Sequence, residues 1–470
     1  MNLPCPPSPA RDLSGFIRAA LWCGTAALLS ASLLWPDCAL RLQSICLYCL
    51  WLEFGIAAYH WCLKGANWPA FMACGWLLAC SLGAWLPFDG ITATVLDLQG
   101  RERRLCDLQI LSQYLWTYIA GYAVLRLGIR CGGGLPRLQG FSEKCCRMLS
   151  PETIAPRTGI TVIRIVCVAS ILTICGFYWY YGVVPIFAKD PAFARYQFFN
   201  GPFTSNLSRF HYRAASALLL LSCLFLTALF RKNGRCVLDA SLIALSIGCM
   251  LSSGSRGDGV AATLFVAFRL VFATPPGKRR QYAAALGVLF LSAFLLLTWY
   301  RQKGHWVNRF TVFPELIEGA WLAHRADSHH VPRAMGKTYA AAALSFVPSS
   351  VLPFREKYGF GRYALRINNL DSPPGVQPPA SSGGIRPTFV GEAYLNGGLA
   401  GVVIAALALG LALGTWTAGE AFRRRSGAAV AYFLLSLCTV MASDFYGAFH
   451  GLALLLLIVW GAECLTAKRS

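Results

Sequence analysis

Three side chains at the start of a long apolar segment have the types and the spacing that acid–base chemistry requires. They are Glu392, Tyr394 and Asn396, and glycines flank them at positions 391, 397 and 398. A carboxylate in the first turns of an apolar helix either complements the positive end of the helix dipole or acts as a shielded general base. The sequence leaves both roles open for Glu392. His324 and His329 are rival proton acceptors, because imidazole titrates near neutral pH.

The sequence also offers cations for binding a phosphate. Arg256 lies in the small-residue segment 253–259 between two apolar runs, where its planar guanidinium suits bidentate phosphate binding. The alternative for this segment is a solvated tight turn. Two long polar segments, 182–213 and 300–388, carry further candidates, which are Arg195 beside Tyr196, Arg301 and Arg355. Their positive charge fits an anionic ligand, or the anionic headgroups of lipids.

Patterns for a metal or a nucleotide are missing from the sequence. It contains no HExxH, no Walker loop and no Asp-x-Asp at a predicted membrane edge. The 19 cysteines fall mostly in apolar runs, including Cys46 and Cys49, so we expect buried apolar thiols and neither zinc nor a disulfide framework. No cofactor and no metal are therefore expected.

The composition indicates which elements must position these residues. Of the 470 residues, 56% are hydrophobic and 13% are charged, which is too apolar for a soluble fold of this length. The sequence predicts an all-α polytopic membrane protein with about twelve transmembrane helices of roughly 20 residues. These spans are 16–35, 42–62, 69–87, 108–127, 159–181, 214–230, 237–253, 257–274, 282–299, 389–415, 428–443 and 448–465.

The distribution of the net charge of +21 predicts the topology. Lys and Arg are concentrated in alternate short loops, which by the positive-inside rule places both termini in the cytoplasm. We expect the first span to be an uncleaved anchor, with a signal peptide as the alternative. Obvious charges inside the spans are few and include Glu53, Arg164 and Arg269; the two arginines lie near cytoplasmic ends, from which they can snorkel.

Residues 1–470 are expected to form a single integral membrane domain with two long outer loops. The first is 182–213, and the second is 300–388, between spans 9 and 10. The second contains an amphipathic helical pattern at 313–324, on which Glu315 and Glu318 are expected to be solvated, and an interfacial or re-entrant segment at 340–353. Residues 371–387 are rich in Pro, Ser and Gly, which is typical of a lid or linker.

Taken in order along the chain, the motifs resemble those of the Wzy-type O-antigen polymerases, also called oligosaccharide repeat unit polymerases. The matching segments, within residues 180–400, are Pro185-Ile186-Phe187 with Ala194-Arg195-Tyr196, Gly254-Ser255-Arg256-Gly257, Gly336-Lys337-Thr338-Tyr339, Phe346-Val347-Pro348 with Arg355-Glu356-Lys357, and the segment 391–398. One departure is that Pro348 is followed by serine, where the family often has arginine. The first 150 residues match only in hydropathy.

The resemblance implies that a growing glycan moves from undecaprenyl diphosphate onto a lipid-linked repeat unit. The reaction lies on the outer face of the bacterial cytoplasmic (inner) membrane and serves O-antigen, capsule or exopolysaccharide synthesis. It is inverting, metal-independent and free of cofactors. In such an enzyme Glu392, His324 or His329 would accept the proton, and arginines would neutralise the leaving diphosphate. The residues implied for the diphosphate are Arg195, Arg256, Arg301 and Arg355, and those implied for the rest of the substrate are Tyr196, Tyr394 and Asn396.

The expected partners are undecaprenyl-diphosphate-linked oligosaccharides and membrane lipids. A chain-length regulator and a flippase are further candidate partners, and nucleic acid is not expected. Two other functions stay open. The first is an O-antigen ligase, which delivers the same donor glycan to lipid A core. The second is a lipid-linked glycan flippase or another twelve-span transporter, which the long basic outer loops and the lack of an internal repeat disfavour.

Overall fold

The protein is mainly helical. The computed structural model describes residues 9–64, 68–81, 93–96, 102–106, 108–134, 156–188, 194, 206–229, 236–253, isolated positions between 262 and 292, 315–344, 351–368, 370 and 387–418. Every structural statement below concerns these residues. The predicted spans 257–274, 282–299, 428–443 and 448–465, and nearly all of the predicted lid 371–387, lie outside them, apart from the isolated positions.

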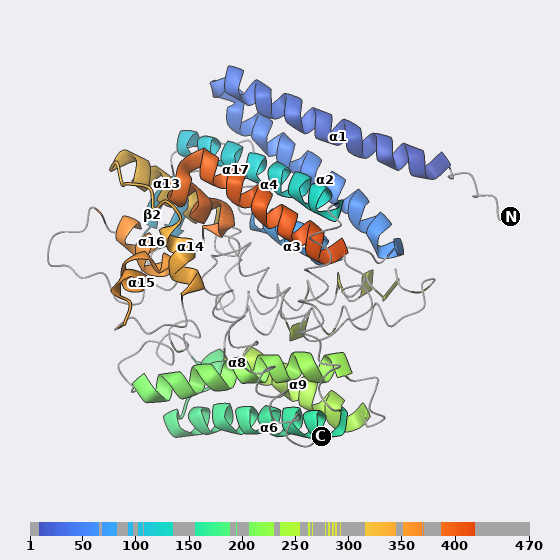
Figure 1. The fold of residues 1–470 in the computed structure, drawn as a ribbon, viewed down its shortest axis with the longest axis vertical. Helices are drawn as coiled ribbons and strands as arrows, with labels where there is room; N and C mark the ends of the chain where they lie inside the picture. Colours follow the sequence, from blue (N-terminus) through green and yellow to red (C-terminus); the bar gives the residue numbers. More distant parts are fainter. Residues whose placement is uncertain are drawn as a thin grey trace.

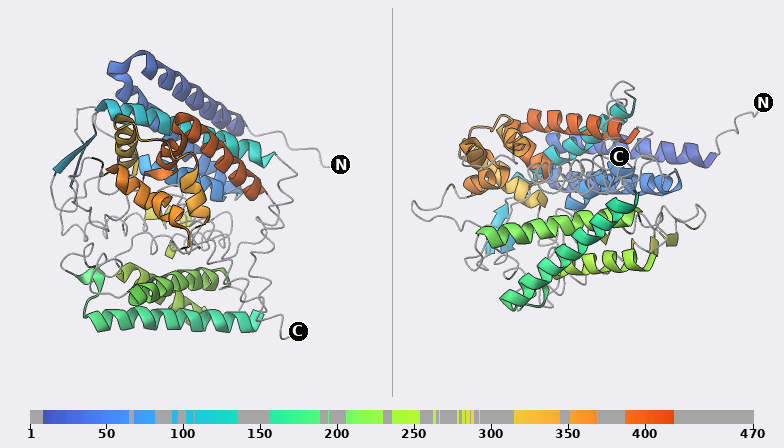
Figure 2. Two further views of the ribbon diagram at one scale, coloured as in Figure 1. Left: turned by 60° about the vertical axis from the view of Figure 1, so that its left-hand side comes forward. Right: turned by 60° about the horizontal axis from the view of Figure 1, so that its bottom comes forward.

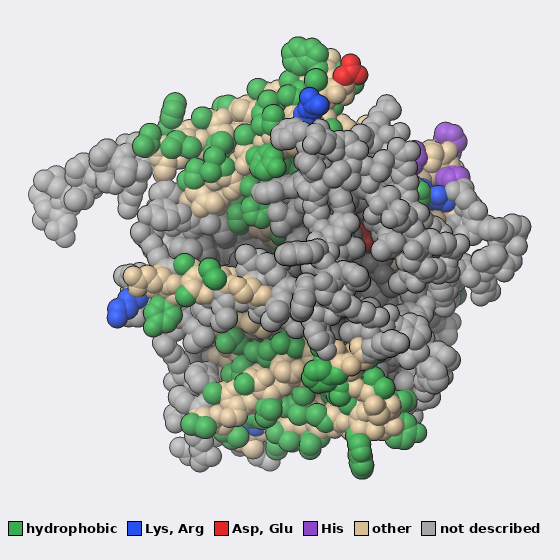
Figure 3. Space-filling model, turned by 180° about the vertical axis from the view of Figure 1, so that it is seen from behind, with side chains coloured by type: hydrophobic (Ala, Val, Ile, Leu, Met, Phe, Trp, Pro, Cys, Tyr) green, Lys and Arg blue, Asp and Glu red, His purple; other side chains and the backbone are tan. Residues whose placement is uncertain are grey.

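Four helices in the described part of the chain are long and apolar enough to cross a membrane. They are α1 (Pro9–Leu34), α2 (Ala39–Lys64), α6 (Pro156–Tyr181) and α17 (Thr388–Ala418). The predicted spans at 69–87, 108–127, 214–230 and 237–253 are also helical where described. The corresponding helices are α3 (Trp68–Cys80), α4 (Leu108–Gly133), α8 (Asn206–Leu229) and α9 (Cys236–Ser252). Apolar side chains cover much of the outer surface of the described helices (Figure 3).

The long helices form two groups (Figure 1). In the first group, α1 packs on α2 as an antiparallel hairpin through the short turn η1 (Pro36–Cys38), and α2 packs on α4, which lies against α17. The second group is α6, α8 and α9. The hydroxyl groups of Tyr178, near the end of α6, and Tyr212, near the start of α8, lie 3.2 Å apart. These two helices are therefore antiparallel. Figure 2 shows both groups from two other sides.

Charged residues inside the second group are paired with each other. Arg164 donates to both carboxylate oxygens of Asp239, at 2.7 and 2.9 Å. That Arg164 can snorkel from a cytoplasmic end stays a prediction, and the structure adds a carboxylate partner for its guanidinium. Asp239 is buried one turn into α9, where it offers the planar guanidinium a bidentate partner that the sequence pattern did not reveal.

Helices α4 and α17 run parallel and approach unusually closely. Tyr114, near the start of α4, donates to the carbonyl of Pro387, and Thr415, near the end of α17, donates to the carbonyl of Gly132. Glycines at positions 128, 132, 410 and 414 allow this approach: a Cβ at position 128 would lie 2.8 Å from the carbonyl oxygen of Leu407, and one at Gly414 would overlap that of Ile129. Small residues at four-residue spacing permit such contacts between apolar helices, where packing must replace the hydrophobic effect.

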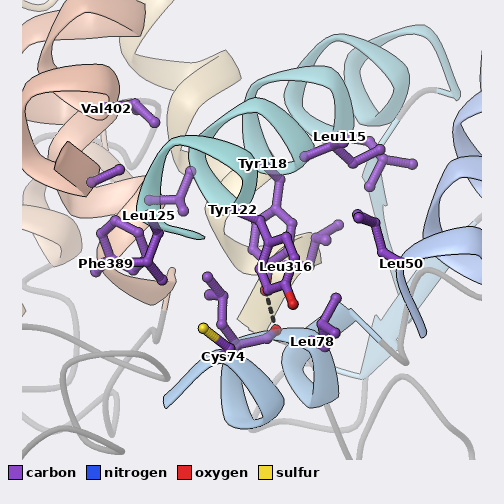
Figure 4. Close-up of a cluster of buried hydrophobic side chains, with 14 of the residues drawn as sticks. Leu50, Cys74, Leu78, Leu115, Tyr118, Tyr122, Leu125, Leu316, Phe389 and Val402 are labelled. Carbon is purple, nitrogen blue, oxygen red and sulfur yellow. Dashed lines mark hydrogen bonds between the residues drawn. The ribbon is translucent and has the colours of Figure 1, made fainter. Parts of the chain in front are cut away.

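A buried core joins α4 to its neighbours (Figure 4). It includes Leu50 of α2, Leu78 of α3, Tyr118 of α4 and Phe389 of α17. The hydroxyl group of Tyr118 donates to the carbonyl of Leu77, which satisfies a polar group that burial would otherwise penalise. The core therefore holds the start of α17 against α4, and this start carries the residues expected to do chemistry.

Four short helices pack beside the start of α17: α13 (Glu315–Ser328), α14 (Lys337–Ala343), α15 (Pro353–Tyr358) and α16 (Phe360–Asn368). They form the orange-coloured end of the molecule in Figure 1. The predicted helix at 313–324 is confirmed and continues to Ser328. The expectation that Glu315 is solvated is wrong: its side chain is buried where α13 meets α4.

Within the described residues, the chain departs from the all-α prediction between α3 and α4. Residues between α3 and α4 contain a two-stranded antiparallel hairpin, β1 (Ala93–Leu96) and β2 (Glu102–Cys106). Val95 pairs with Arg103, and Leu96 with Glu102. Two of the four residues of β1, Thr94 and Val95, are branched at Cβ. Such side chains favour extended backbone.

Candidate functional site

The fold brings together two segments that the sequence singled out separately. The turn that leads into α14 lies against the first turns of α17, and two backbone hydrogen bonds join them. The N–H of Ala334 donates to the carbonyl of Leu395 at 3.1 Å, and that of Met335 donates to the carbonyl of Asn396 at 2.9 Å. These carbonyls can accept bonds from the turn because α17 is kinked immediately after them.

Two adjacent glycines make this kink. Gly397 has φ −153° and ψ 20°, and Gly398 has φ 62° and ψ −150°. The conformation of Gly398 is one that a residue with a Cβ adopts only at a cost. Because the helical hydrogen-bond pattern is broken there, the preceding carbonyl groups need other donors. The glycine pair that the sequence placed next to Asn396 therefore builds the docking position for residues 334–336.

A buried polar network lies between the two segments. Thr338 donates through Oγ1 to Oε1 of Glu392 at 2.7 Å, and Asn396 donates through Nδ2 to Thr338 Oγ1 at 2.6 Å. Asn396 Nδ2 also lies 2.9 Å from the backbone oxygen of Glu392. Glu392 and Asn396 are four residues apart, so a helix places them on one face. Glu392 has 0% of its surface exposed.

The turn itself has unusual backbone conformations. His330, Met335 and Gly336 all have positive φ, at 51°, 50° and 79°. The N–H of Gly336 donates to Oδ1 of Asn396 at 2.9 Å, which fixes the left-handed residue that begins α14. Backbone in this region is held only where its surroundings determine it strongly. Here Asn396 accepts hydrogen bonds from the backbone N–H groups of Met335 and Gly336 and donates to the side chain of Thr338.

Tyr339 borders the same network. Burial and the negative charge of Glu392 raise the pKa of Tyr339 above its ordinary value, opposed by a side-chain hydrogen bond with Asn396. The phenol therefore stays protonated at neutral pH, as a neutral neighbour of the buried carboxylate.

An exposed charged cluster lies beside the enclosed network. Arg333 donates through Nη2 to Oδ1 of Asp327 at 2.5 Å, and the hydroxyl group of Tyr394 donates to Oδ2 of Asp327 at 2.7 Å. The guanidinium of Arg333 lies 4.6 Å from the centre of the Tyr394 ring, within cation–π range. The side chains of Arg333 and Asp327 are 28% and 44% exposed, so both can reach a ligand in solution.

Sequence reasoning missed Asp327 and Arg333. Their spacing of six residues matches no helical face, and only the turn at 329–336 brings the two side chains together. A signal was available in the neighbouring glycine at 336, which marks a turn, but it does not indicate what the turn brings into contact.

The two candidate histidines belong to α13 and the residue that follows it. His324 is half-buried, with its ring 6.5 Å from that of Trp321. His329 is exposed at the end of α13, where its N–H donates to the carbonyl of Arg325. Figure 3 shows histidine side chains at the surface of this end of the molecule.

The structure unites only part of the predicted site. It brings Glu392, Tyr394 and Asn396 together with the segment 336–339. Arg195, Tyr196, Arg256 and Arg301 lie outside the described residues. Arg355 belongs to α15, and its side chain is likewise not described. Within the described part of the chain, no group of three or more His, Cys, Asp or Glu side chains is arranged to hold a metal ion.

Comparison with protein-family models, with curated protein sequences and with solved structures gives no match for this chain. Its function must therefore be argued from its own residues.

Proposed function

We propose that the protein is a membrane glycan polymerase. It transfers a growing glycan from undecaprenyl diphosphate onto a lipid-linked repeat unit on the outer face of the bacterial cytoplasmic membrane. One observation carries the proposal: two of the segments on which the family resemblance rests form one hydrogen-bonded unit. Thr338 and Glu392, which are 54 residues apart in the sequence, are in direct contact at the start of a helix apolar enough to span a membrane.

The proposal includes the predicted topology, with about twelve spans and both termini in the cytoplasm. The relative directions of the described helices support it. In the predicted order, α4 and α17 are the fourth and tenth spans and should run parallel, while α1 and α2, or α6 and α8, should run antiparallel. The contacts at the helix ends have these directions.

The proposed reaction needs a proton acceptor at the surface of the site. The acceptor hydroxyl attacks the anomeric carbon, the bond from that carbon to the diphosphate oxygen breaks, and the hydroxyl proton passes to a carboxylate. Such a group must come within hydrogen-bond reach of the hydroxyl. Glu392 is enclosed, so we assign it a positioning role: its hydrogen bond with Thr338 holds the segment 333–339 in place. The exposed carboxylate of Asp327, oriented by Tyr394 and Arg333, then accepts the proton.

The leaving diphosphate needs cations. Arg333 is the cation nearest Asp327 among the described contacts and has exposed surface. Arg195, Arg256, Arg301 and Arg355 stay predictions for the same role, and Tyr196 stays a prediction for substrate binding. Preorganised guanidinium groups would stabilise the charge that develops on the diphosphate without a metal.

Deletion of the gene in its host tests the function. The surface glycans and the lipid-linked glycans are then compared on a gel. A polymerase predicts that the ladder collapses to a single repeat unit that still reaches its final acceptor. Long glycan that accumulates on its lipid carrier at the outer face would replace the proposal by a ligase, and single units trapped at the inner face would replace it by a flippase. An unchanged ladder would overturn all three.

Two isosteric substitutions test the assigned roles in the same ladder assay. Asp327→Asn removes the proton acceptor but keeps the shape of the side chain, and we expect polymerisation to fall at least 100-fold. Glu392→Gln keeps an oxygen that accepts from Thr338, so a positioning residue should retain activity within about tenfold. If Glu392→Gln folds and loses as much activity as Asp327→Asn, Glu392 is the proton acceptor and our assignment is wrong.

A further inference from the structure

A second buried carboxylate lies far from this site, within the α1–α2–α4 group. Glu53 of α2 is only 1% exposed, and its Oε1 atom accepts hydrogen bonds from two arginines. Arg18 of α1 donates through Nε at 2.9 Å and through Nη2 at 2.7 Å, and Arg126 of α4 donates through Nη2 at 3.1 Å. One carboxylate thus holds two guanidinium groups together.

This cluster carries an excess of positive charge. Two guanidinium groups against one carboxylate leave a net charge of +1, and the exposed Arg130 lies one turn beyond Arg126 on α4. An unbalanced charge in or near hydrocarbon is expensive, so it is usually compensated by a partner of opposite sign or reaches the interface. Arg18 is 29% exposed and Arg126 is 13% exposed, so the positive side of the cluster is accessible from outside the bundle.

Two buried polar atoms around Arg126 lack a hydrogen-bond partner among the described residues. One is the indole Nε1 of Trp22, whose ring centre lies 5.7 Å from the guanidinium carbon of Arg126. The other is Oε2 of Glu53. The indole N–H of Trp22 is a donor and suits the oxygen of an anion or a water molecule, whereas Oε2 of Glu53 only accepts and adds nothing to anion binding. The cluster therefore has an unused donor as well as unused charge.

The ion pair between Arg164 and Asp239 provides a contrast to this excess. Arg164 of α6 is matched bidentately by the carboxylate of Asp239, and the pair carries no net charge. Arg18 of α1 and Arg164 of α6 both lie toward the start of a helix that is apolar enough to span a membrane. Among the described residues, the charge of Arg164 is balanced by a carboxylate, whereas that of the Arg18–Arg126 cluster is only half balanced.

The depth of the cluster suits a lipid headgroup. Arg18 lies in the second turn of the apolar stretch Leu13–Leu34, and Arg126 lies near the end of α4. In the predicted topology both positions are on the cytoplasmic side. Basic sites between helices at this level bind phosphate-bearing headgroups.

We infer that Arg18, Arg126 and Arg130 bind the phosphate of an anionic phospholipid of the cytoplasmic leaflet. Glu53 holds the first two guanidinium groups in position, and Arg130 extends the positive surface outward. The inference rests on the membrane placement in the proposed function. It does not depend on glycan transfer, so a protein without polymerase activity could still pass the test below.

Native mass spectrometry of the full chain in detergent tests the site. Phosphatidylglycerol and phosphatidylcholine with the same acyl chains are titrated, and the occupancy of the first bound lipid is measured. We expect the wild type to prefer phosphatidylglycerol at least fivefold. Because an arginine near the lipid surface contributes about 1 kcal/mol, Arg18→Gln and Arg130→Gln should each reduce this preference about fivefold. Arg130 takes no part in the hydrogen bonds to Glu53, so its replacement should leave the fold intact.

Arg41→Gln is the control, because it removes the same charge from an exposed arginine near the start of α2, on the outer side in the predicted topology, and should leave the lipid preference unchanged. The inference is overturned if the wild type shows no preference, or if Arg41→Gln lowers it as much as Arg18→Gln and Arg130→Gln do. It is also overturned if soluble glycerol 3-phosphate, at the same concentration as the lipid, displaces bound phosphatidylglycerol, since the ligand would then be a free phosphate and not a membrane lipid.

Discussion

Glu392 and Glu53, two of the buried glutamates among the described residues, have partners of opposite kinds. Glu392, at the start of α17, accepts a hydrogen bond from the neutral hydroxyl of Thr338. Glu53 of α2 accepts from two guanidinium groups. The first belongs to the end of the α4–α17 pair at which Tyr114 meets Pro387, and the second lies beside Arg126 toward the other end.

The difference shows what each carboxylate does for the fold. The described donor to Glu392, the hydroxyl of Thr338, is uncharged and directional, so the carboxylate helps to order a turn whose backbone is otherwise unfavourable. Around Glu53 the partners are charged, so the carboxylate keeps two like charges together. Removing a neutral partner leaves a polar group unsatisfied, whereas removing the anion between two cations leaves repulsion in a medium of low polarity. The two sites should therefore respond to mutation with different magnitudes.

The largest effect is expected for Glu53→Ala. The substitution leaves the guanidinium groups of Arg18 and Arg126 close together without a counter-charge, and breaking a buried ion pair from one side costs about 3–5 kcal/mol. Unfolding of the purified protein in mixed micelles, followed by circular dichroism against denaturant concentration, measures the loss. Asp37→Ala is the control, since it removes an exposed carboxylate from η1 and should change stability by less than about 0.5 kcal/mol. If Glu53→Ala and Asp37→Ala lost the same free energy of unfolding, the change in net charge, and not the buried pairing with arginine, would explain the effect.

A somewhat smaller effect is expected for Gly414→Leu, which acts on the helix pair that connects the two ends. A Cβ at position 414 overlaps the carbonyl of Ile129, which is backbone and cannot rotate away, so α4 and α17 must separate. Overpacking of this kind costs about 1–3 kcal/mol. Gly24→Leu on α1 is the control, because a Cβ there meets no atom within 4 Å. If both variants unfold at the same denaturant concentration, close packing of α4 on α17 does not contribute to stability.

The sequence predicted the helices well and their partners poorly. Long apolar runs mark helices directly, and the glycines at 397 and 398 mark a break. The pairing of Arg18 with Glu53, or of Arg164 with Asp239, depends on which helix faces deliver each side chain to its neighbour. A single sequence contains no signal for contacts across that many residues. The hairpin of β1 and β2 was missed because strands of four and five residues lie at the lower limit of the patterns on which strand prediction relies.

For the candidate site, sequence reasoning identified the enclosed residues and missed the exposed ones. Glu392 and Asn396 stand four apart in an apolar helix, where polar residues are conspicuous. Asp327 and Arg333 lie among many charged residues of a basic loop, so their type carries little information. Only the turn that Asn396 holds in place brings them to Tyr394.

An intermediate effect is expected for Thr338→Val, which changes the neutral site. The substitution keeps the shape of the side chain but removes the donor to Glu392 and the acceptor for Asn396. A buried polar group left without its partner costs about 1–3 kcal/mol, less than the loss predicted at Glu53. Thr338→Ser retains the hydroxyl and should lose clearly less. The same denaturant unfolding measures both variants, and a loss for serine equal to that for valine would show that the methyl group, and not the hydrogen bonds, stabilises this site.

The smallest effect is expected for the pair Asp327–Arg333, because both side chains are partly exposed and water screens their attraction. Exposed ion pairs contribute about 0.2–1 kcal/mol. A double-mutant cycle with Asp327→Asn and Arg333→Gln measures the coupling free energy, and raising the salt concentration should reduce it. If the coupling instead exceeded 2 kcal/mol and resisted salt, the pair would behave like the buried charges at Glu53. A small coupling together with a large loss of glycan polymerisation for Asp327→Asn would show that this exposed pair contributes to catalysis and hardly to stability, in contrast to the enclosed carboxylate beside it.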